Sequence, residues 1–198
     1  LLTATARSEI DKFLGGETYD DLVSRTGEAG ERSKDMETVE KVIDQDLHRT
    51  FPGHKDIDNP GGKEQLRRVL VAYAARNRDV GYCQSMNFIA ASLLIVTKSE
   101  EDAFWHLALF EERIIKEYHA RHMFGCRTEC RFLMELAKKY VPAAYEHLEK
   151  NQVIPEVAFI HWFLCIFVNS LPFGTAMRVW DKLMANMKES TQLQYPIE

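Results

Sequence analysis

Long apolar runs and a cysteine framework are both missing from this 198-residue chain. Its most apolar segment, VAFIHWFLCIFV at residues 157–168, falls short of the ~20 residues that a membrane-spanning helix needs. The segment also contains His161, so we expect a buried core helix there and no transmembrane segment in the chain. Four cysteines do not make a dense disulfide framework, which favours a reducing, cytoplasmic environment.

An excess of positive charge is missing as well. The net charge is −5, so no nucleic-acid partner is expected. A basic cluster is present, but at helical spacing its members point in different directions. It consists of Arg67, Arg68, Arg76 and Arg78. We keep as a hypothesis that this cluster meets acidic residues on a protein partner.

Nucleotide- and metal-binding motifs are also lacking. The sequence has no G-x-x-x-x-G-K-[ST] loop and no evident magnesium-binding cluster, so we expect no nucleotide, metal or other cofactor of its own. Two weaker alternatives remain. The first is a zinc site, because residue types that bind zinc occur at helical spacing at His119, His122, Cys126 and Cys130. No common zinc motif matches this spacing. A cysteine hydrolase could use Cys83 or Cys165, but no nucleophile signature surrounds either residue.

The alternation of apolar and polar residues that predicts β-strands is absent, whereas helical periodicity dominates from Glu37 onward. A turn is expected at DNPGG, residues 58–62. The predicted helices are residues 39–47, 66–77, a segment after Gly81 that ends near Val96, and residues 100–118, 128–149, 155–169 and 173–187. The sequence therefore predicts an all-α fold: a single domain of many packed helices.

The domain has polar segments at both ends. Residues 1–36 predict a short helix and a loop that belong to the same domain, and residues 37–187 form its helical body. Residues 188–198 are polar and are expected to form a tail. Because the chain begins with leucine rather than methionine, we expect a fragment.

A polar pair interrupts the apolar stripe of the first predicted helix. A rotation of ~100° per residue places Asp46 within the stripe of Val39, Val42 and Ile43. A buried carboxylate is costly unless it is paired, and Arg49 lies three residues on. The pair is either a structural ion pair that closes the helix end, or a brace for an arginine that contacts an anion.

The third predicted helix begins with polar residues although the rest of it is apolar. Gln84, Ser85 and Asn87 occupy this first turn, where they either satisfy free backbone N–H groups or face an anion. Arg49 and Gln84 together would suit phosphoryl transfer, since an arginine stabilises charge on phosphate oxygens and a glutamine orients the attacking water. Without a nucleotide loop, the chain would supply these groups to a nucleotide held by another protein.

Two motifs then carry a resemblance to a known family. IDQDLHRTFP, residues 43–52, matches the I-x-x-D-x-x-R-T signature of the TBC domain family, and GYCQSMNFIA, residues 81–90, matches its Y-x-Q signature. The segments LRRVLVAYAARNRDVGYCQ and SLPFGTAMRVWD are similar to TBC sequences as well. The resemblance runs over residues 39–181 and implies an all-helical GTPase-activating protein for Rab GTPases. It implies in addition that the domain is truncated on its C-terminal side.

The resemblance also implies roles for individual residues. Arg49 would be an arginine finger and Gln84 a glutamine finger, both acting in trans on a bound Rab. Asp46 would brace Arg49. Many family members have glycine at the position of Ser85, so we expect its side chain to affect how closely the Rab approaches. The remaining supporting residues are Thr50, Tyr82 and Asn87.

The implied partner is a GTP-bound Rab GTPase, which would itself hold GTP and Mg²⁺. The chain would be an activator rather than an enzyme, and it would regulate vesicle or membrane trafficking. It would be cytoplasmic and recruited to membranes at most peripherally, through its partner or other domains. The alternative is a non-catalytic module that binds GTP-bound Rab without hydrolysing its nucleotide.

Overall fold

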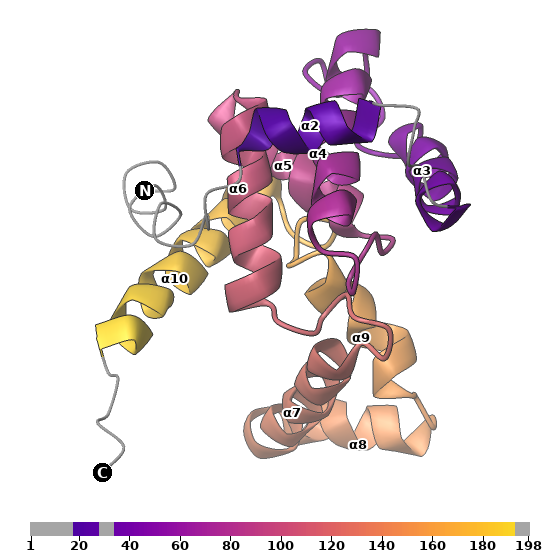
Figure 1. The fold of residues 1–198 in the computed structure, drawn as a ribbon. Helices are drawn as coiled ribbons and strands as arrows, with labels where there is room; N and C mark the ends of the chain where they lie inside the picture. The colour runs from indigo at the N-terminus through magenta and orange to yellow at the C-terminus, as the bar shows by residue number, and fades with distance from the viewer. Residues whose placement is uncertain (1–17, 28–33, 193–198) are drawn as a thin grey trace.

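In the computed structural model, residues 18–27 and 34–192 are described, and every regular element within those ranges is a helix (Figure 1). The predicted all-α fold is therefore confirmed. The elements are α2 (Tyr19–Gly27), α3 (Lys34–Leu47), α4 (Pro60–Arg76), α5 (Met86–Thr97), α6 (Glu100–Leu109), the π-helix η1 (Phe110–Ile114), α7 (Phe124–Tyr140), α8 (Pro142–Lys150), α9 (Pro155–Leu164) and α10 (Phe173–Gln192).

Several helix ends differ from the predicted ones for local reasons. DNPGG is not only a turn: α4 begins at Pro60, because the Asn59 side chain caps it by accepting a hydrogen bond from the Gly62 N–H at 2.9 Å. The predicted helix 128–149 is two helices, since Pro142 lacks an N–H and starts a new helix. The helix predicted for 100–118 changes to π geometry at Phe110.

In the C-terminal half, one helix is shorter than predicted and another is longer. The helix predicted for 155–169 ends at Leu164, and residues 165–170 form turns instead. Helix α10 extends to Gln192, so it includes residues that were assigned to the polar tail, whereas residues 193–198 lie outside the described part. Most of residues 1–36 also lie outside it, apart from α2 and the first turn of α3.

Helix α4 is the centre of the N-terminal half, where it packs against α2, α3, α5 and α6 (Figure 1). Leu66, Val69 and Tyr73 of α4 are fully buried, as is Ile89 of α5. Helix α5 is apolar on nearly all sides, and most of its residues are buried, whereas Val96 near its C-terminal end is 37% exposed. This packing fixes the start of α5 beside the end of α3, which is where the candidate site lies.

The apolar segment of α9 is not a buried core helix, contrary to the prediction. Among the residues of α9, only Leu164 is buried, while Val157 is 80% exposed and Trp162 is 38% exposed. Helix α9 packs against α7, and Figure 1 shows both with α8 at the foot of the molecule, away from α2 and α3. An all-round apolar pattern does not reveal which faces of a helix are covered, which is why the prediction failed.

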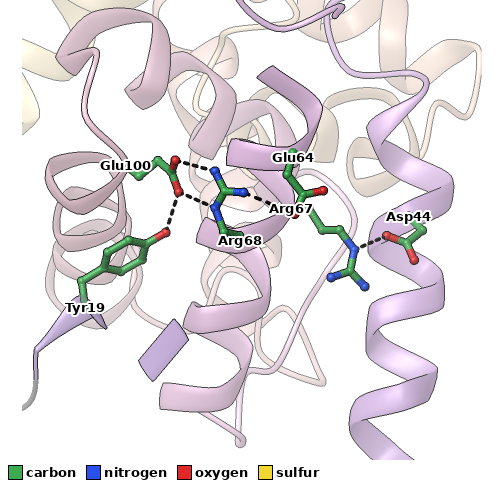
Figure 2. Close-up of polar contacts among 6 residues, drawn as sticks. All are labelled: Tyr19, Asp44, Glu64, Arg67, Arg68 and Glu100. Carbon is green, nitrogen blue, oxygen red and sulfur yellow. Dashed lines mark hydrogen bonds and ion pairs between the residues drawn. The ribbon is translucent and has the colours of Figure 1, made fainter. Parts of the chain in front are cut away.

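The adjacent arginines of α4 point to opposite sides and bind carboxylates of other helices (Figure 2). Arg67 reaches α3, where its Nε donates to Asp44 at 2.7 Å. Arg68 reaches α6, where its Nε and Nη2 bind the two oxygens of Glu100 at 2.9 and 2.7 Å. Glu100 also accepts a hydrogen bond from the Tyr19 hydroxyl of α2 at 3.1 Å. These arginines therefore tie four helices together and form no basic patch.

The other two arginines of the cluster, Arg76 and Arg78, do not form a basic surface patch either. Arg76 donates to Glu112 at 3.2 Å and lies over the Trp105 ring at 5.4 Å, whereas Arg78 is exposed. With three of the four engaged inside the chain, the hypothesis that they bind an acidic partner loses its basis.

The Glu100 carboxylate should contribute to stability in a pH-dependent way. Its hydrogen bonds with Arg68 hold the pKa of Glu100 below its ordinary value. A depressed pKa contributes stability above the unfolded-state pKa of about 4.3, and this contribution is lost as the pH falls through the folded-state pKa. We expect Glu100→Gln to lower the unfolding temperature at neutral pH and to flatten its decline in acid, as measured by circular dichroism from pH 7 to pH 3.

Glu64→Gln is the matched control for this measurement. Glu64 also contacts Arg68, at 3.3 Å, but its side chain is 57% exposed, so solvent screens the pair. We expect little change in unfolding temperature at any pH. Equal effects of the two substitutions would contradict a special role for Glu100.

Candidate functional site

The buried carboxylate of Asp46 is bound on both oxygens at the end of α3. Asp46 is 2% exposed and lies beside the buried Ile43, whereas Val42 of the predicted stripe faces outward. Its Oδ1 contacts Arg49 Nη2 at 2.5 Å, and its Oδ2 accepts from the Tyr82 hydroxyl at 2.6 Å. Each oxygen thus has a strong donor, which offsets the desolvation of the charge.

Arg49 is braced on one edge and open to solvent elsewhere. It lies two residues beyond the end of α3, and its side chain is 52% exposed. Its backbone N–H also donates to the Asp46 carbonyl at 3.2 Å. A guanidinium has five N–H donors in a fixed plane, so one that binds Asp46 retains others for an external anion. The braced position restricts the side-chain rotamers before any ligand arrives.

The Tyr82 hydroxyl is a permanent donor to Asp46. Burial and the hydrogen bond to the Asp46 carboxylate raise the pKa of Tyr82 far above its ordinary value. The hydroxyl therefore stays protonated at every physiological pH. Tyr82 lies two residues before Gln84, so this bond connects the segment that carries Gln84 to the helix end that carries Arg49.

A second chain of hydrogen bonds joins the same two segments through buried side chains. The Thr50 hydroxyl donates to the Asp46 carbonyl at 2.7 Å, and Asn87 Nδ2 donates to Thr50 Oγ1 at 2.7 Å. Asn87 Oδ1 in turn accepts from the Ser85 N–H at 3.1 Å. Thr50 and Asn87 are 1% and 0% exposed. Periodicity alone had given Thr50 no role; only the family motif singled it out.

Gln84 projects from a tight turn, not from the first turn of a helix as predicted. Helix α5 begins at Met86, and the Met86 N–H donates to the Cys83 carbonyl at 3.1 Å to close the turn. Gln84 is the second residue of this turn and is exposed. The third residue, Ser85, has φ +103° and ψ −29°, close to the third position of a type II turn. The turn directs the Gln84 side chain outward.

Ser85 itself is buried, which corrects the expectation that its side chain affects the approach of a partner. The residue is 1% exposed, so its side chain faces the interior and cannot touch a protein that docks outside. It also makes no capping hydrogen bond to α5. Any effect of Ser85 on function must act through the turn that it belongs to.

The structure does not support the zinc alternative. Both ring nitrogens of His119 are engaged, Nδ1 with Glu111 Oε2 at 2.9 Å and Nε2 with the Leu164 carbonyl at 3.0 Å. Burial lowers the pKa of His119, but the Glu111 charge and these hydrogen bonds outweigh it and raise the pKa, which favours a doubly protonated ring. His122 is exposed, and within residues 18–27 and 34–192 no group of three potential ligands is placed to hold a metal ion.

The structure does not support the cysteine-hydrolase alternative, because neither Cys83 nor Cys165 has an activated thiol. Burial raises the pKa of Cys83 to about 11, so its thiolate is scarce at neutral pH. Cys165 is 3.9 Å from His161 Nδ1, but the thiol is fully buried and burial raises its pKa. A substrate cannot reach it in this conformation.

Comparison with known proteins identifies the family. The family model described as the Rab-GTPase-TBC domain matches residues 8–194, a longer range than the motifs alone mark. The chain belongs to the Rab-GTPase-TBC domain family. Growth hormone-regulated TBC protein 1 of Xenopus laevis is 41% identical over 145 residues, which cover 72% of this chain and 42% of that protein. Carabin of Mus musculus is 36% identical over 170 residues, 85% of this chain and 36% of that protein.

Solved structures agree with this assignment. The crystal structure of the Chlamydomonas flagellar RabGAP TBC domain matches with a TM-score of 0.76 and 31% identity, covering 92% of this chain and 59% of that one. The Ypt/Rab-GAP domain of Gyp1p matches with a TM-score of 0.71 and 20% identity over 94% and 63% of the two chains, which supports the fold alone.

The TBC chain spans less than half the length of these curated relatives. None of the helices in the described part is long and apolar enough to cross a membrane.

The buried amide of Asn87 should be needed to hold the two segments of the site together. Asn87→Ala leaves the Ser85 N–H and the Thr50 hydroxyl without their buried partner, which costs about 1–3 kcal/mol of unfolding free energy. The loss is measured as a lower midpoint of urea unfolding. Ser92→Ala is the control, because the Ser92 hydroxyl binds only the Phe88 carbonyl within α5. Equal losses in the two variants would contradict the linking role of Asn87.

Proposed function

We propose that this chain accelerates GTP hydrolysis by a Rab-family GTPase, with Arg49 and Gln84 acting in trans on the nucleotide. Membership of the Rab-GTPase-TBC domain family and the likeness to a RabGAP TBC domain support the class of activity. The chain carries no nucleotide-binding loop, so GTP and Mg²⁺ would both be held by the partner. Such an activator would regulate vesicle or membrane trafficking.

The main support for this proposal is that Arg49 and Gln84 are exposed side chains at the edge of one buried hydrogen-bond network. Asp46, Tyr82 and Asn87 connect the backbone segments of these two residues, while the side chains of both point to solvent. A network that served only stability would not need an exposed arginine and an exposed glutamine at its edge. A side chain that enters a partner's active site must be exposed to solvent and also held in a limited range of orientations.

The chemistry follows from the two side-chain types. The guanidinium of Arg49 would stabilise the negative charge that spreads over the γ-phosphate oxygens as the bond to the leaving group breaks. The Gln84 amide can accept a hydrogen bond from the attacking water and donate one to a phosphate oxygen. Asp46 would keep Arg49 oriented, and Tyr82 would keep Asp46 in place.

A non-catalytic Rab-binding module is the alternative. It would use the same surface to hold GTP-bound Rab, but it would have no use for the brace between Asp46 and Arg49 beyond local stability. The two functions differ in a single measurable quantity, the rate of GTP hydrolysis on the bound partner.

Single-turnover hydrolysis by a panel of GTP-loaded Rabs tests the proposal. An arginine finger is worth ~10³–10⁵ in rate, or roughly 4–7 kcal/mol of activation barrier. We expect Arg49→Ala to remove most of the acceleration, and Gln84→Ala to reduce it strongly while binding persists. Full acceleration by Arg49→Ala would refute the mechanism, and binding without acceleration by the wild-type chain would favour the binding module.

Two exposed residues elsewhere give matched controls for these substitutions. Arg178 is an exposed arginine of α10, and Gln45 is an exposed glutamine of α3. Neither takes part in the hydrogen bonds around Asp46. We expect Arg178→Ala and Gln45→Ala to retain the wild-type rate. A comparable loss in either control would show that the assay reports surface charge or folding rather than the two proposed fingers.

A further inference from the structure

His119, in the loop between η1 and α7, has a fully buried ring that lies between two acceptors. Its Nδ1 is 2.9 Å from Oε2 of Glu111 in η1, and its Nε2 is 3.0 Å from the carbonyl oxygen of Leu164, the last residue of α9. A neutral imidazole has a single N–H, so it can donate to only one of these acceptors. The two contacts together therefore fit a doubly protonated ring, which donates to both.

Both partners of the ring also favour a positive charge. Glu111 is 4% exposed, and its second oxygen, Oε1, has no hydrogen-bond partner within the described residues. A buried carboxylate is costly unless an opposite charge pairs with it. The Leu164 carbonyl lies at the C-terminal end of α9, where carbonyls lack partners inside the helix and attract cations. A proton on the ring is thus favoured from two sides.

The other titratable groups around this pair either keep their protons at neutral pH or have partners elsewhere. Burial raises the pKa of three side chains on neighbouring elements, and the charge of Glu111 adds to the effect: Tyr73 of α4, Cys83 before α5 and Cys126 of α7. Glu112 is paired with Arg76 at 3.2 Å, and His161 of α9 is exposed. Among the buried groups named here, the one whose charge changes near neutral pH is therefore the His119–Glu111 pair.

The turn that follows Leu164 is strained. Ile166 and Phe167 both have positive φ, at 43° and 65°, although neither is glycine. Such a conformation persists only where the surroundings hold it in place. Side chains bind carbonyls on both sides of the strain: His119 binds that of Leu164, and the indole N–H of the buried Trp180 donates to that of Ile166 at 2.9 Å. Loss of the His119 bond would remove one of these two restraints.

We propose that His119 is a pH-sensitive link between η1 and the end of α9, which is complete only while its ring carries two protons. When the ring loses one proton to water, it keeps a single N–H and releases either Glu111 or the Leu164 carbonyl. The strained turn after α9 then loses a restraint. The inference does not depend on the proposed function, because it concerns the packing of this chain alone.

The direction of the pH effect follows from the surroundings of the ring. Burial by itself would lower the pKa of His119, but the Glu111 charge and the two hydrogen bonds raise it above its ordinary value. A raised pKa contributes stability that is fully present below the unfolded-state pKa of about 6.5. This contribution is lost as the pH rises through the folded-state pKa.

The protonation of the ring is tested by the ¹⁵N chemical shifts of its two nitrogens in the intact chain at pH 7.5. An unperturbed histidine is mostly neutral at this pH, whereas we expect both nitrogens of His119 to be protonated. In Glu111→Gln we expect a neutral ring, because the new amide can donate to Nδ1 while the Nε2–H still binds Leu164. A neutral His119 ring in the wild-type chain would overturn the inference.

The link itself is tested by hydrogen exchange of the Phe167 amide, which donates to the Trp162 carbonyl at 2.7 Å within the strained turn. After correction for the intrinsic exchange rate, we expect protection in the wild-type chain to fall by about tenfold per pH unit above pH 6.5, until the folded-state pKa is reached, because opening releases one proton. Glu111→Gln should remove this dependence. His119→Phe, which lacks both donors, should show low protection at every pH.

His122→Gln is the matched control, because His122 is an exposed histidine of the same loop. We expect it to keep the pH dependence of the wild-type chain. Protection that does not vary with pH in the wild-type chain would refute the link, and so would a dependence that persists in Glu111→Gln. If His119→Phe does not fold, the comparison of the wild-type chain with Glu111→Gln still decides.

Discussion

The buried carboxylate of Asp46 is the group on which the candidate site depends. A charge at 2% exposure is tolerated only because Arg49 and Tyr82 bind its two oxygens from different segments of the chain. Removing Arg49 leaves an uncompensated charge in the interior, and removing the Tyr82 hydroxyl leaves one carboxylate oxygen without its donor. The requirement works in both directions: Asp46 needs both donors, and its bond to Arg49 in turn holds that guanidinium at the surface, where a phosphate-bearing partner would meet it.

Sequence patterns predicted this part of the site for a physical reason. The helical period placed Asp46 in the buried face of α3, and the cost of burying a carboxylate required a partner within reach. The same reasoning failed for contacts that depend on tertiary structure. No local pattern joins Thr50 to Asn87 or Asp46 to Tyr82, because those pairs lie far apart in sequence and meet only after the helices pack.

In the fold, too, some features could be predicted from the local sequence, whereas others depend on tertiary packing. Periodicity predicted that the chain is all-α, and proline and cap residues explain the helix starts at Pro60 and Pro142. Periodicity did not show that α9 leaves much of its apolar surface exposed. It also did not show that Arg67 and Arg68 of α4 bind carboxylates of neighbouring helices. Both depend on what lies opposite a helix face, which one helix's own sequence does not contain.

Backbone strain lies beside both proposed fingers. Phe51, two residues after Arg49, has φ +43°, and Ser85, directly after Gln84, has φ +103°. Neither is glycine, so each conformation costs free energy that the surroundings must offset. Phe51 packs edge-on against Phe88 of α5 at 5.5 Å, and Asn87 binds both strained segments through Thr50 and Ser85. Tight packing and buried hydrogen bonds thus hold two turns in shapes that unsupported chains avoid, and this restraint keeps Arg49 and Gln84 directed outward before a partner binds.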